Sequence, residues 1–517
     1  MLKQRKEYFM KKLVLVLLAV TLVFTACEKE VEENPIPEAT ETVILLSDSE
    51  IKTEGTLKDS VIVANDIVYY EEGHDYTYGE GDESDAHSKE EADLHSVVHI
   101  TEAGTYRIKG TLSHGQIAVD LGEDAKNDPN AVVTLILDGV DITSTVAPAV
   151  IFYNVFECGD KDNATKDVDL SSAGARVILE KDSVNTVNGS YVAKIYKPET
   201  VIDGNVDDAK KLHKYDAAFY SKMSMTLDGE GTLNINAENE GLDSELHLTI
   251  NGGNINIKSG NDGINTNEDN VSVTTVNGGI LTIEVTGETG EGDGIDSNGW
   301  LVINGGTVIT SACAESADAG IDSDKGIYIN GGTVMAGGSM LDRIEDGGQT
   351  FVVFSFTEKE KREAMTLKNE NGDVIFSETL PNAFTTLIFS SPSLTEGTYT
   401  LWQGDTKLEG MRTSAMVDFN GGRFPSGFPR PEGMEIPENF KPNRPEGERE
   451  FNGDIESIPP SFEKGEFTPP DRVPPEKEFE HLEKTDSDKM TEHITTKEML
   501  SEEFVIEKGA NYFRIAG

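Results

Sequence analysis

The triplet Asn-Gly-Gly recurs at nearly equal intervals, and this repeat limits the possible folds more than any other feature of the sequence. The steps between its four occurrences are 26, 27 and 26 residues. Short stretches in which apolar and polar residues alternate flank the triplets, as at residues 246–250 and 255–257. Alternation with a period of two residues is typical of β-strands. The triplets begin at Asn251, Asn277, Asn304 and Asn330.

Two short strands that meet at a glycine-rich corner, repeated about every 26 residues, match one coil of a parallel β-helix. A leucine-rich repeat has a similar length, but it requires a leucine and asparagine pattern with a helical segment, which residues 251–338 lack. Weaker copies of the pattern lie upstream, so we expect the coils to begin near Val97. The sequence therefore predicts an all-β fold, namely a right-handed parallel β-helix with a small C-terminal β cap and a disordered Pro/Gly-rich insertion.

The asparagines of the four triplets have an expected structural role in this fold. In stacked coils they would lie above one another at the strand spacing of about 4.8 Å. At that spacing, the side-chain amide of one coil can donate a hydrogen bond to the amide of the next. We therefore interpret these asparagines as a ladder that holds the coils together.

The N-terminus has the features of a bacterial lipoprotein signal. Lys11 and Lys12 precede the apolar residues 13–23, and small residues then lead to Cys27. The apolar run is short for a membrane span, and a cysteine after small residues suits lipid attachment followed by cleavage. We expect an exported lipoprotein at the outer membrane or cell surface, held to the membrane only by lipid on Cys27. The alternative is an ordinary signal peptide with an incidental cysteine.

Composition divides the rest of the chain into further segments. The acidic stretch after Cys27 and the stretch rich in Pro and Gly near the C-terminus have no apolar period, so neither is expected to fold alone. Cys158 and Cys313 are too few to define a disulfide framework and are interpreted as small buried residues. The predicted segments are the signal peptide (1–27), a flexible tether (28–42), an N-terminal β segment with an acidic loop (43–96), the β-helix (97–348), the β cap (349–418), the disordered insertion (419–481) and a closing segment (482–517).

The chain is strongly acidic, and the acidity excludes one large class of partners. It has 44 Lys plus Arg against 94 Asp plus Glu, which gives a net charge of −50. Such a charge repels the phosphate backbone, so nucleic acid is not an expected partner. Cations, in contrast, are attracted.

A second, acidic repeat lies between the Asn-Gly-Gly corners. In each copy, an Ile or Leu can point inward while the residues around it carry oxygen atoms outward, and the glycine permits the bend. Stacked coils would bring these carboxylates to about 5 Å from one another, where like charges repel. The copies are Glu240-Gly-Leu-Asp243-Ser, Asp262-Gly-Ile-Asn265-Thr, Asp293-Gly-Ile-Asp296-Ser and Ala319-Gly-Ile-Asp322-Ser.

Bound cations can neutralise these turns, because the chain itself offers few positive charges there. From Asp228 to Asp342 there are 19 Asp plus Glu, but only Lys258 and Lys325 and no Arg. Clustered oxygen ligands without His or Cys favour a hard cation, and flexible turns favour Ca²⁺ over Mg²⁺. The alternative is a set of solvated acidic turns. The predicted ligands are Asp243, Asp262, Asn265, Asp293, Asp296, Asp318, Asp322 and Asp324.

Three further motifs precede the repeated corners, namely Gly104-Thr-Tyr-Arg-Ile-Lys-Gly110, Gly115-Gln-Ile and Leu137-Asp-Gly-Val-Asp-Ile142. Together with the corners, they resemble a family of secreted carbohydrate-binding β-helix proteins, over about residues 95 to 340. It implies calcium, binding of cellulose-like or pectin-like polysaccharide, and a fold similar to that of polysaccharide lyases in a protein that binds without catalysis. The family corner usually has Lys where this chain has Asn265, Asp296 and Asp322, and this change removes positive charge.

Two other functions stay open at this point. A calcium-dependent polysaccharide lyase would need a base, for which Lys258 and Lys325 are the nearby candidates. A purely structural or adhesive surface protein would use the coils as a stiff spacer. Aromatic stacking on sugar is expected to be minor, because Trp300 and Tyr328 are the only aromatic residues from Asp228 to Asp342. Binding of polysaccharide without catalysis is the function that the sequence favours.

Overall fold

The computed structural model describes residues 41–71, 86–192, 195–196, 202, 211–213, 215–360, 363–413 and 500–516. The predicted signal peptide with Cys27, most of the predicted tether and the predicted insertion at residues 419–481 lie outside the described residues. Within the described part, the chain is almost entirely β. It contains one short α-helix, α2 (Lys89–Ala92), and two 3-10 helices (Lys58–Ser60 and Glu123–Asn127). None of the helices described is long and apolar enough to cross a membrane.

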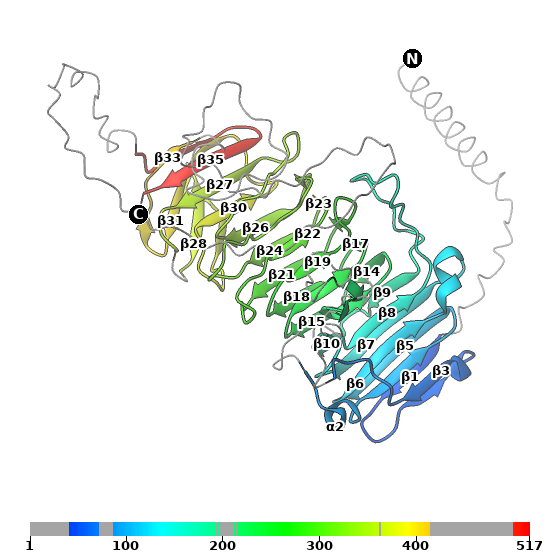
Figure 1. Ribbon diagram of the computed structural model, residues 1–517. Helices are drawn as coiled ribbons and strands as arrows, with labels where there is room; N and C mark the ends of the chain where they lie inside the picture. The colour runs from blue at the N-terminus through cyan, green and yellow to red at the C-terminus, as the bar shows by residue number, and fades with distance from the viewer. Residues whose placement is uncertain are drawn as a thin grey trace, which may run out of the picture. The chain divides into compact units, whose positions relative to one another are not determined.

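The chain coils through three sheets, and each coil between residues 150 and 311 contributes one strand to each sheet (Figure 1). We call the sheet that contains the acidic repeat the acidic sheet. Its strands are parallel, except that β3 and β4 are antiparallel. The acidic sheet consists of β3 (Val61–Ala64), β4 (Ser96–Ile100), β6 (Gly115–Asp120), β8 (Val150–Asn154), β13 (Ala217–Ser221), β16 (Glu240–Ser244), β19 (Ile264–Thr266) and β22 (Ile295–Ser297).

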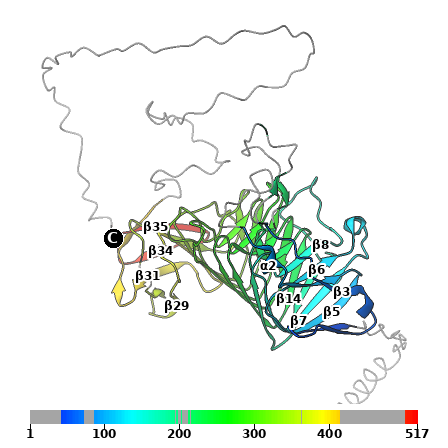
Figure 2. The same ribbon diagram turned by 60° about the horizontal axis from the view of Figure 1, so that its bottom comes forward.

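The middle sheet follows the acidic sheet in each coil, and its neighbouring strands are all parallel. It lies in a different layer from β6 and β8, as the second view shows (Figure 2). The middle sheet consists of β5 (Gly104–Leu112), β7 (Val133–Thr143), β9 (Ala175–Leu179), β14 (Met225–Gly229), β17 (His247–Ile250), β20 (Val273–Val276), β23 (Trp300–Ile303) and β25 (Ile327–Ile329).

The third sheet follows the Asn-Gly-Gly corners. It begins with the later parts of β5 and β7, which are long enough to continue from the middle sheet, and its strands are parallel as far as β26. Before the first coil, β1 (Thr42–Leu46) pairs in parallel with β5, and β2 (Lys52–Glu54) is antiparallel to β1. The other strands of the third sheet are β10 (Val184–Gly189), β15 (Thr232–Ala237), β18 (Asn254–Ser259), β21 (Ile280–Val285), β24 (Thr307–Ser311) and β26 (Thr333–Gly338).

Alternation within these strands builds one continuous core. In the third sheet, Ile255, Leu281 and Val308 occupy the same register position in consecutive coils, and each is at most 1% exposed. The residues between them along each strand face outward. Burial of an aliphatic side chain contributes about 1.5–3 kcal/mol, so each coil is stabilised mainly by its neighbours. The prediction of an all-β fold with stacked parallel strands is confirmed, and the handedness of the coils stays a prediction.

The predicted asparagine ladder is present. The Nδ2 atom of Asn277 donates to the Oδ1 atom of Asn251 at 2.9 Å, Asn304 donates to Asn277 at 2.9 Å, and Asn330 donates to Asn304 at 2.8 Å. The second glycine of each triplet is required by the bend. At Gly306, φ is +78°, and a Cβ atom would lie 2.8 Å from the carbonyl oxygen of Gly279. The repeat is therefore a structural corner, as the sequence indicated.

We expect Asn277→Ala to lower the free energy of unfolding by about 1 kcal/mol. The substitution removes the hydrogen bond that Asn277 donates and the one that it accepts, both at an exposed corner. Urea denaturation followed by circular dichroism measures the effect. Asn371→Ala, at an exposed turn, is the control and should change the value by less than about 0.5 kcal/mol. Equal stability of the two variants would show that the ladder has no energetic role.

Antiparallel strands end the parallel stacking. β30 (Thr386–Ser390) is antiparallel to β26 and to β27 (Phe351–Phe356). β35 (Ala510–Ile515), from the C-terminal end of the chain, pairs in parallel with β27 and antiparallel with β33 (Gly410–Arg412). A second apolar core packs here around Phe354, Phe389 and Phe513.

The remaining strands form two small sheets. In the five-stranded sheet, the pairings are antiparallel. The two-stranded sheet consists of β11 (Ile195–Tyr196) and β12 (Lys211–His213). The five strands are β28 (Met365–Asn369), β29 (Val374–Glu378), β31 (Gly397–Gln403), β32 (Thr406–Lys407) and β34 (Phe504–Ile506).

Candidate functional site

The acidic repeat forms rows of side chains along the acidic sheet. Asp243, Asn265 and Asp296 pair in register across β16, β19 and β22. The backbone N–H of Asp322 donates to the carbonyl oxygen of Ile295 at 2.7 Å, which continues the same row into the next coil. The apolar residues of the motif point inward, as predicted. Leu242, Ile264, Ile295 and Ile321 are all fully buried.

A second acidic row precedes the apolar residues by two positions, and its carboxylates bind the backbone of the next coil. The N–H of Asp293 donates to Oδ1 of Asp262 at 2.6 Å, and the N–H of Ala319 donates to Oδ1 of Asp293 at 2.5 Å. Each of these carboxylates uses one oxygen to connect two coils. No described residue donates a hydrogen bond to the other oxygen, which can therefore bind a ligand.

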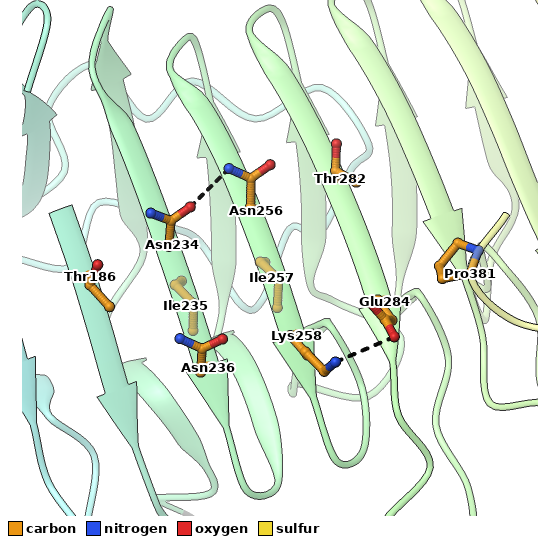
Figure 3. Close-up of a pocket in the computed structure, with 10 residues that line it drawn as sticks. All are labelled: Thr186, Asn234, Ile235, Asn236, Asn256, Ile257, Lys258, Thr282, Glu284 and Pro381. Carbon is orange, nitrogen blue, oxygen red and sulfur yellow. Dashed lines mark hydrogen bonds and ion pairs between the residues drawn. The ribbon is translucent and has the colours of Figure 1, made fainter. Parts of the chain in front are cut away.

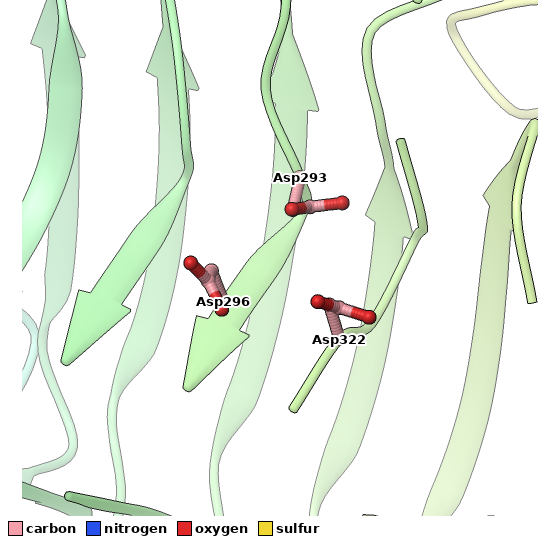
Figure 4. Close-up of side chains that lie close together, drawn as sticks. All are labelled: Asp293, Asp296 and Asp322. Atoms are coloured by element: carbon pink, nitrogen blue, oxygen red, sulfur yellow. The ribbon is translucent and has the colours of Figure 1, made fainter. Parts of the chain in front are cut away.

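The two rows approach one another most closely at Asp293, Asp296 and Asp322. One carboxylate oxygen from each of the three lies within 4.8 Å of the other two. In Figure 4, the three side chains converge from neighbouring coils. Asp293 and Asp322 form no ion pair with any Lys or Arg in the part of the chain that the structure describes. We call these three residues the aspartate trio.

Burial and mutual repulsion raise the pKa values of carboxyls in the trio. Burial, followed by the charges of Asp342 and Asp296, raises the pKa of Asp322 to about 8. Burial, followed by the charges of Asp322 and Asp262, also raises the pKa of Asp293 well above its usual range. Without a counter-charge, the folded chain therefore favours the protonated form of these groups. A cation would reverse this preference.

Similar shifts extend along the acidic sheet toward β16. Burial and the charge of Glu240 raise the pKa values of both Asp243 and Asp262 well above their usual range. Asp243 is fully buried, and both of its oxygens accept from Nδ2 of Asn267, at 2.7 and 2.8 Å. Its side chain is thus already bound within the protein. Asp262, in contrast, lies between Glu240 and the trio.

Asn265 contributes a buried amide oxygen to the first of these rows. Its side chain is 7% exposed, and its Nδ2 atom donates to Glu240 at 3.2 Å. Its Oδ1 atom has no hydrogen-bond partner among the described residues. A buried carbonyl oxygen without a partner costs free energy, which a coordinated cation would recover. The residues therefore fit an oxygen-ligated hard cation such as Ca²⁺.

The remaining predicted ligands, Asp318 and Asp324, are not part of the trio. Asp318 accepts from the N–H of Gly292 at 2.6 Å and from the hydroxyl of Ser316. Asp324 is exposed. The structure therefore brings Asp293, Asp296 and Asp322 together, places Asp262 and Asn265 in the adjoining coil, and leaves Asp243 and Asp318 bound to protein groups.

Sequence reasoning missed two carboxylates as possible ligands, one beyond the last coil and one in the second acidic row. Asp342 is 8% exposed and accepts from the N–H of Ser323 at 3.1 Å, and its charge acts on Asp322. It follows the last coil and carries no trace of the repeat. Glu240 was noted within the motif but not as a ligand. It occupies the position in its coil that Asp262 and Asp293 occupy in theirs.

The two lysines considered as bases lie near other partners. Lys258 is on β18 of the third sheet, and its Nζ atom is 3.5 Å from Oε1 of Glu284. The Lys325 ammonium lies 4.5 Å from the centre of the Trp300 ring, where a cation–π contact holds it. No ion pair joins either lysine to the trio among the residues described.

The fold and the site define a class of protein, in which parallel β coils present an edge rich in carboxylate and amide oxygens. The family model described as "Carbohydrate-binding domain-containing protein" matches residues 95–159 and 160–370, more than half of the chain. The chain belongs to this family of carbohydrate-binding domain-containing proteins.

Two known proteins are similar to the chain. A carbohydrate-binding domain-containing protein of Acetivibrio thermocellus is 31% identical over 163 residues, which cover 31% of this chain and 45% of that protein. The match thus spans less than half of the relative's length. A solved structure, that of a polysaccharide lyase-like protein from C. thermocellum, aligns with a TM-score of 0.36 at 20% identity and covers 58% of this chain and 91% of that one.

Proposed function

We propose that this protein is a cell-surface lipoprotein that binds polysaccharide through Ca²⁺ at the acidic sheet, without catalysis. The observation that carries the proposal is the convergence of Asp293, Asp296 and Asp322, each with an oxygen within 4.8 Å of the others. The family of the chain supports carbohydrate as the ligand. Ca²⁺ held there would stabilise the folded chain and present open coordination positions to sugar oxygens.

Charge favours a bridging role for the cation. The chain has a net charge of −50, so a polymer that carries carboxylates is repelled unless a cation lies between them. Asp293, Asp296 and Asp322 would hold the ion, with Asp262 and Asn265 in the adjoining coil as further oxygen donors. A pectin-like polymer could then supply its own carboxylates or hydroxyls as the remaining ligands.

The absence of catalysis is inferred from the surroundings of the possible bases. A lyase needs a group that removes a proton from the sugar beside the metal. Lys258 belongs to another sheet and faces Glu284, and Lys325 is held over the Trp300 ring. Lipid on Cys27 would keep the protein at the membrane, where binding retains the polymer at the cell surface.

Asp296→Ala is expected to weaken retention of polygalacturonate in the presence of Ca²⁺. The substitution removes one carboxylate of the trio, and loss of such a group lowers metal affinity by about tenfold or more. Retention is measured on immobilised polygalacturonate with Ca²⁺ and with EDTA.

Asp405→Ala, which removes an exposed carboxylate in a turn between β31 and β32, is the matched control and should bind like the unsubstituted protein. The proposal fails if EDTA leaves retention unchanged or if both variants bind equally. Unsaturated sugar products in the same samples would indicate a lyase instead.

A further inference from the structure

The outer surface of the third sheet carries a groove that has no role in the function proposed above. Thr186, Asn234, Asn256 and Thr282 pair in register across β10, β15, β18 and β21. They face outward, while the apolar residues between them, such as Ile257, face the core. These polar side chains form the floor of a groove of about 460 Å³ (Figure 3).

A loop of the C-terminal part forms one end of this groove. Pro381 stands at the end that lies beyond β21 (Figure 3). The next residue, Asn382, is 8% exposed and anchors the loop, because its Nδ2 atom donates to the carbonyl oxygens of Val285 at 2.6 Å and Ala312 at 2.8 Å. Its backbone N–H donates to Oγ of Ser311 at 3.1 Å. The wall is therefore fixed to the sheet.

A second hollow lies beside the first, toward the C-terminal ends of the same strands. It has a volume of about 360 Å³, is lined by Thr143, Asn188 and Glu288 among others, and shares Asn236 and Lys258 with the first hollow. Together they run across the strands from β7 to β21. Four strand spacings of about 4.8 Å give a length of about 19 Å, which accommodates several sugar units of an extended chain.

The floor of the groove is neutral and rich in hydrogen-bonding groups. Nδ2 of Asn256 donates to Oδ1 of Asn234 at 3.0 Å, and Nδ2 of Asn236 donates to Oδ1 of Asn188 at 2.7 Å. A side-chain amide has two N–H donors and an oxygen that accepts twice, so each ladder bond leaves capacity for a ligand. The ladder also holds the amides in place before binding, which lowers the entropic cost of association.

The groove differs in charge from the acidic sheet. Among the described residues that line the groove, Lys258 is the only cation, and its Nζ atom lies 3.5 Å from Oε1 of Glu284. Glu284 thus offsets the charge of Lys258, and Glu238 and Glu288 at the rim of the groove would repel a carboxylated polymer. Sugar hydroxyls, which both donate and accept, match the amides and threonine hydroxyls of the floor.

We propose that this groove binds a neutral polysaccharide, a linear chain of uncharged hexoses, without a metal ion. The site is separate from the aspartate trio and lies on another sheet. The protein would then hold a neutral polymer and an acidic one on two surfaces of the same coils. The described residues that line the groove include no aromatic side chain, so binding relies on hydrogen bonds rather than on stacking.

Affinity gel electrophoresis of the full chain in hydroxyethyl cellulose, with EDTA present, tests the proposal. The unsubstituted protein should be retarded. Thr282→Arg, which places a long cation in the floor, and Asn256→Asp, which exchanges an amide for a charge, should each weaken binding about tenfold, as expected when one or two hydrogen bonds are lost. Asn277→Asp is the matched control, because it changes one amide of a ladder at the corner, outside the groove.

Three results would overturn the proposal: no retardation of the unsubstituted protein, retardation that disappears in EDTA, or equal weakening by Asn277→Asp. Thermal melts of the variants separate loss of binding from loss of folding. Polygalacturonate gels with Ca²⁺ are run in parallel, and the groove variants should be retarded there like the unsubstituted protein. Failure of the groove and failure of the calcium site are thereby distinguished.

Discussion

Saturating Ca²⁺ should raise the melting temperature of the protein at about pH 8 by about 5 °C or more over its value in EDTA. One carboxyl oxygen from each of Asp293, Asp296 and Asp322 lies within 4.8 Å of the other two, and no lysine or arginine of the described chain forms an ion pair with Asp293 or Asp322, so a bound ion would supply the counter-charge. An ion bound only by the folded state at about 100 times its Kd adds about 2.7 kcal/mol to stability. Differential scanning calorimetry measures the shift.

The choice of ion and a substituted chain provide the controls for this melting experiment. Mg²⁺ should give a smaller shift, because it requires a stricter octahedral arrangement than the trio and its neighbours supply. Asp322→Asn should lose most of the Ca²⁺ effect, while Asp405→Asn should keep it. Identical melting in EDTA and in Ca²⁺, with no metal found by elemental analysis, would remove the basis of the proposed calcium site.

Much of the coiled body could be predicted, because most of its contacts join equivalent positions in consecutive repeats. Asn277 meets Asn251 and Asn304 because each lies one coil away, and the spacing of the triplets contains that information. The inward position of Ile264 and Ile295 follows in the same way from alternation. Residues in register across parallel strands are thus readable from the sequence once the period is known.

The contacts of individual carboxylates in the acidic sheet could not be predicted, because equivalent positions of the repeat have different neighbouring side chains. Asp243 and Asp296 occupy equivalent positions, yet Asp243 is bound by Asn267 whereas Asp296 joins the trio. Asp342 approaches from beyond the last coil, where the pattern has ended.

The groove on the third sheet could not be predicted from the sequence either. Asn382, which anchors its end wall, contacts Val285 across a separation of 97 residues. The floor residues looked like ordinary outward positions of strands. A hollow of this kind depends on a contact between the coils and a loop that is distant in the chain, and no local pattern records such a contact.

Without metal, the free energy of unfolding should fall as the pH rises from about 6.5 to about 8. The expected fall is about 2 kcal/mol for each carboxyl that is protonated in the folded state and deprotonated in the unfolded state. The pKa of Asp322 is raised to about 8 by burial and by neighbouring carboxylates, while an unfolded aspartate titrates near pH 4. In this window the folded state holds a proton that the unfolded state has lost. Stability from such a raised carboxyl pKa is therefore present at low pH and lost as the pH approaches the folded value.

Groups with lowered pKa values change stability in the opposite direction, but they titrate outside the range from about pH 6.5 to about pH 8. Burial lowers the pKa of His247 to about 4, so its contribution changes below about pH 6.5, where the unfolded imidazole becomes protonated. The pKa values of Glu41 and Asp138, lowered beside Arg107 and Lys109, matter only in more acidic solution. Between about pH 6.5 and about pH 8, the raised carboxyls of the acidic sheet dominate the slope.

Calcium should reverse the sign of this dependence, because the ion binds the deprotonated carboxylates and competes with protons for them. Urea denaturation in EDTA and in Ca²⁺, at several pH values across the window, measures both slopes. Asp322→Asn removes one titrating group and should flatten the slope in EDTA, whereas Asp405→Asn should leave it unchanged. Equal slopes with and without Ca²⁺ would mean that the raised carboxyls of the acidic sheet do not exchange protons for metal.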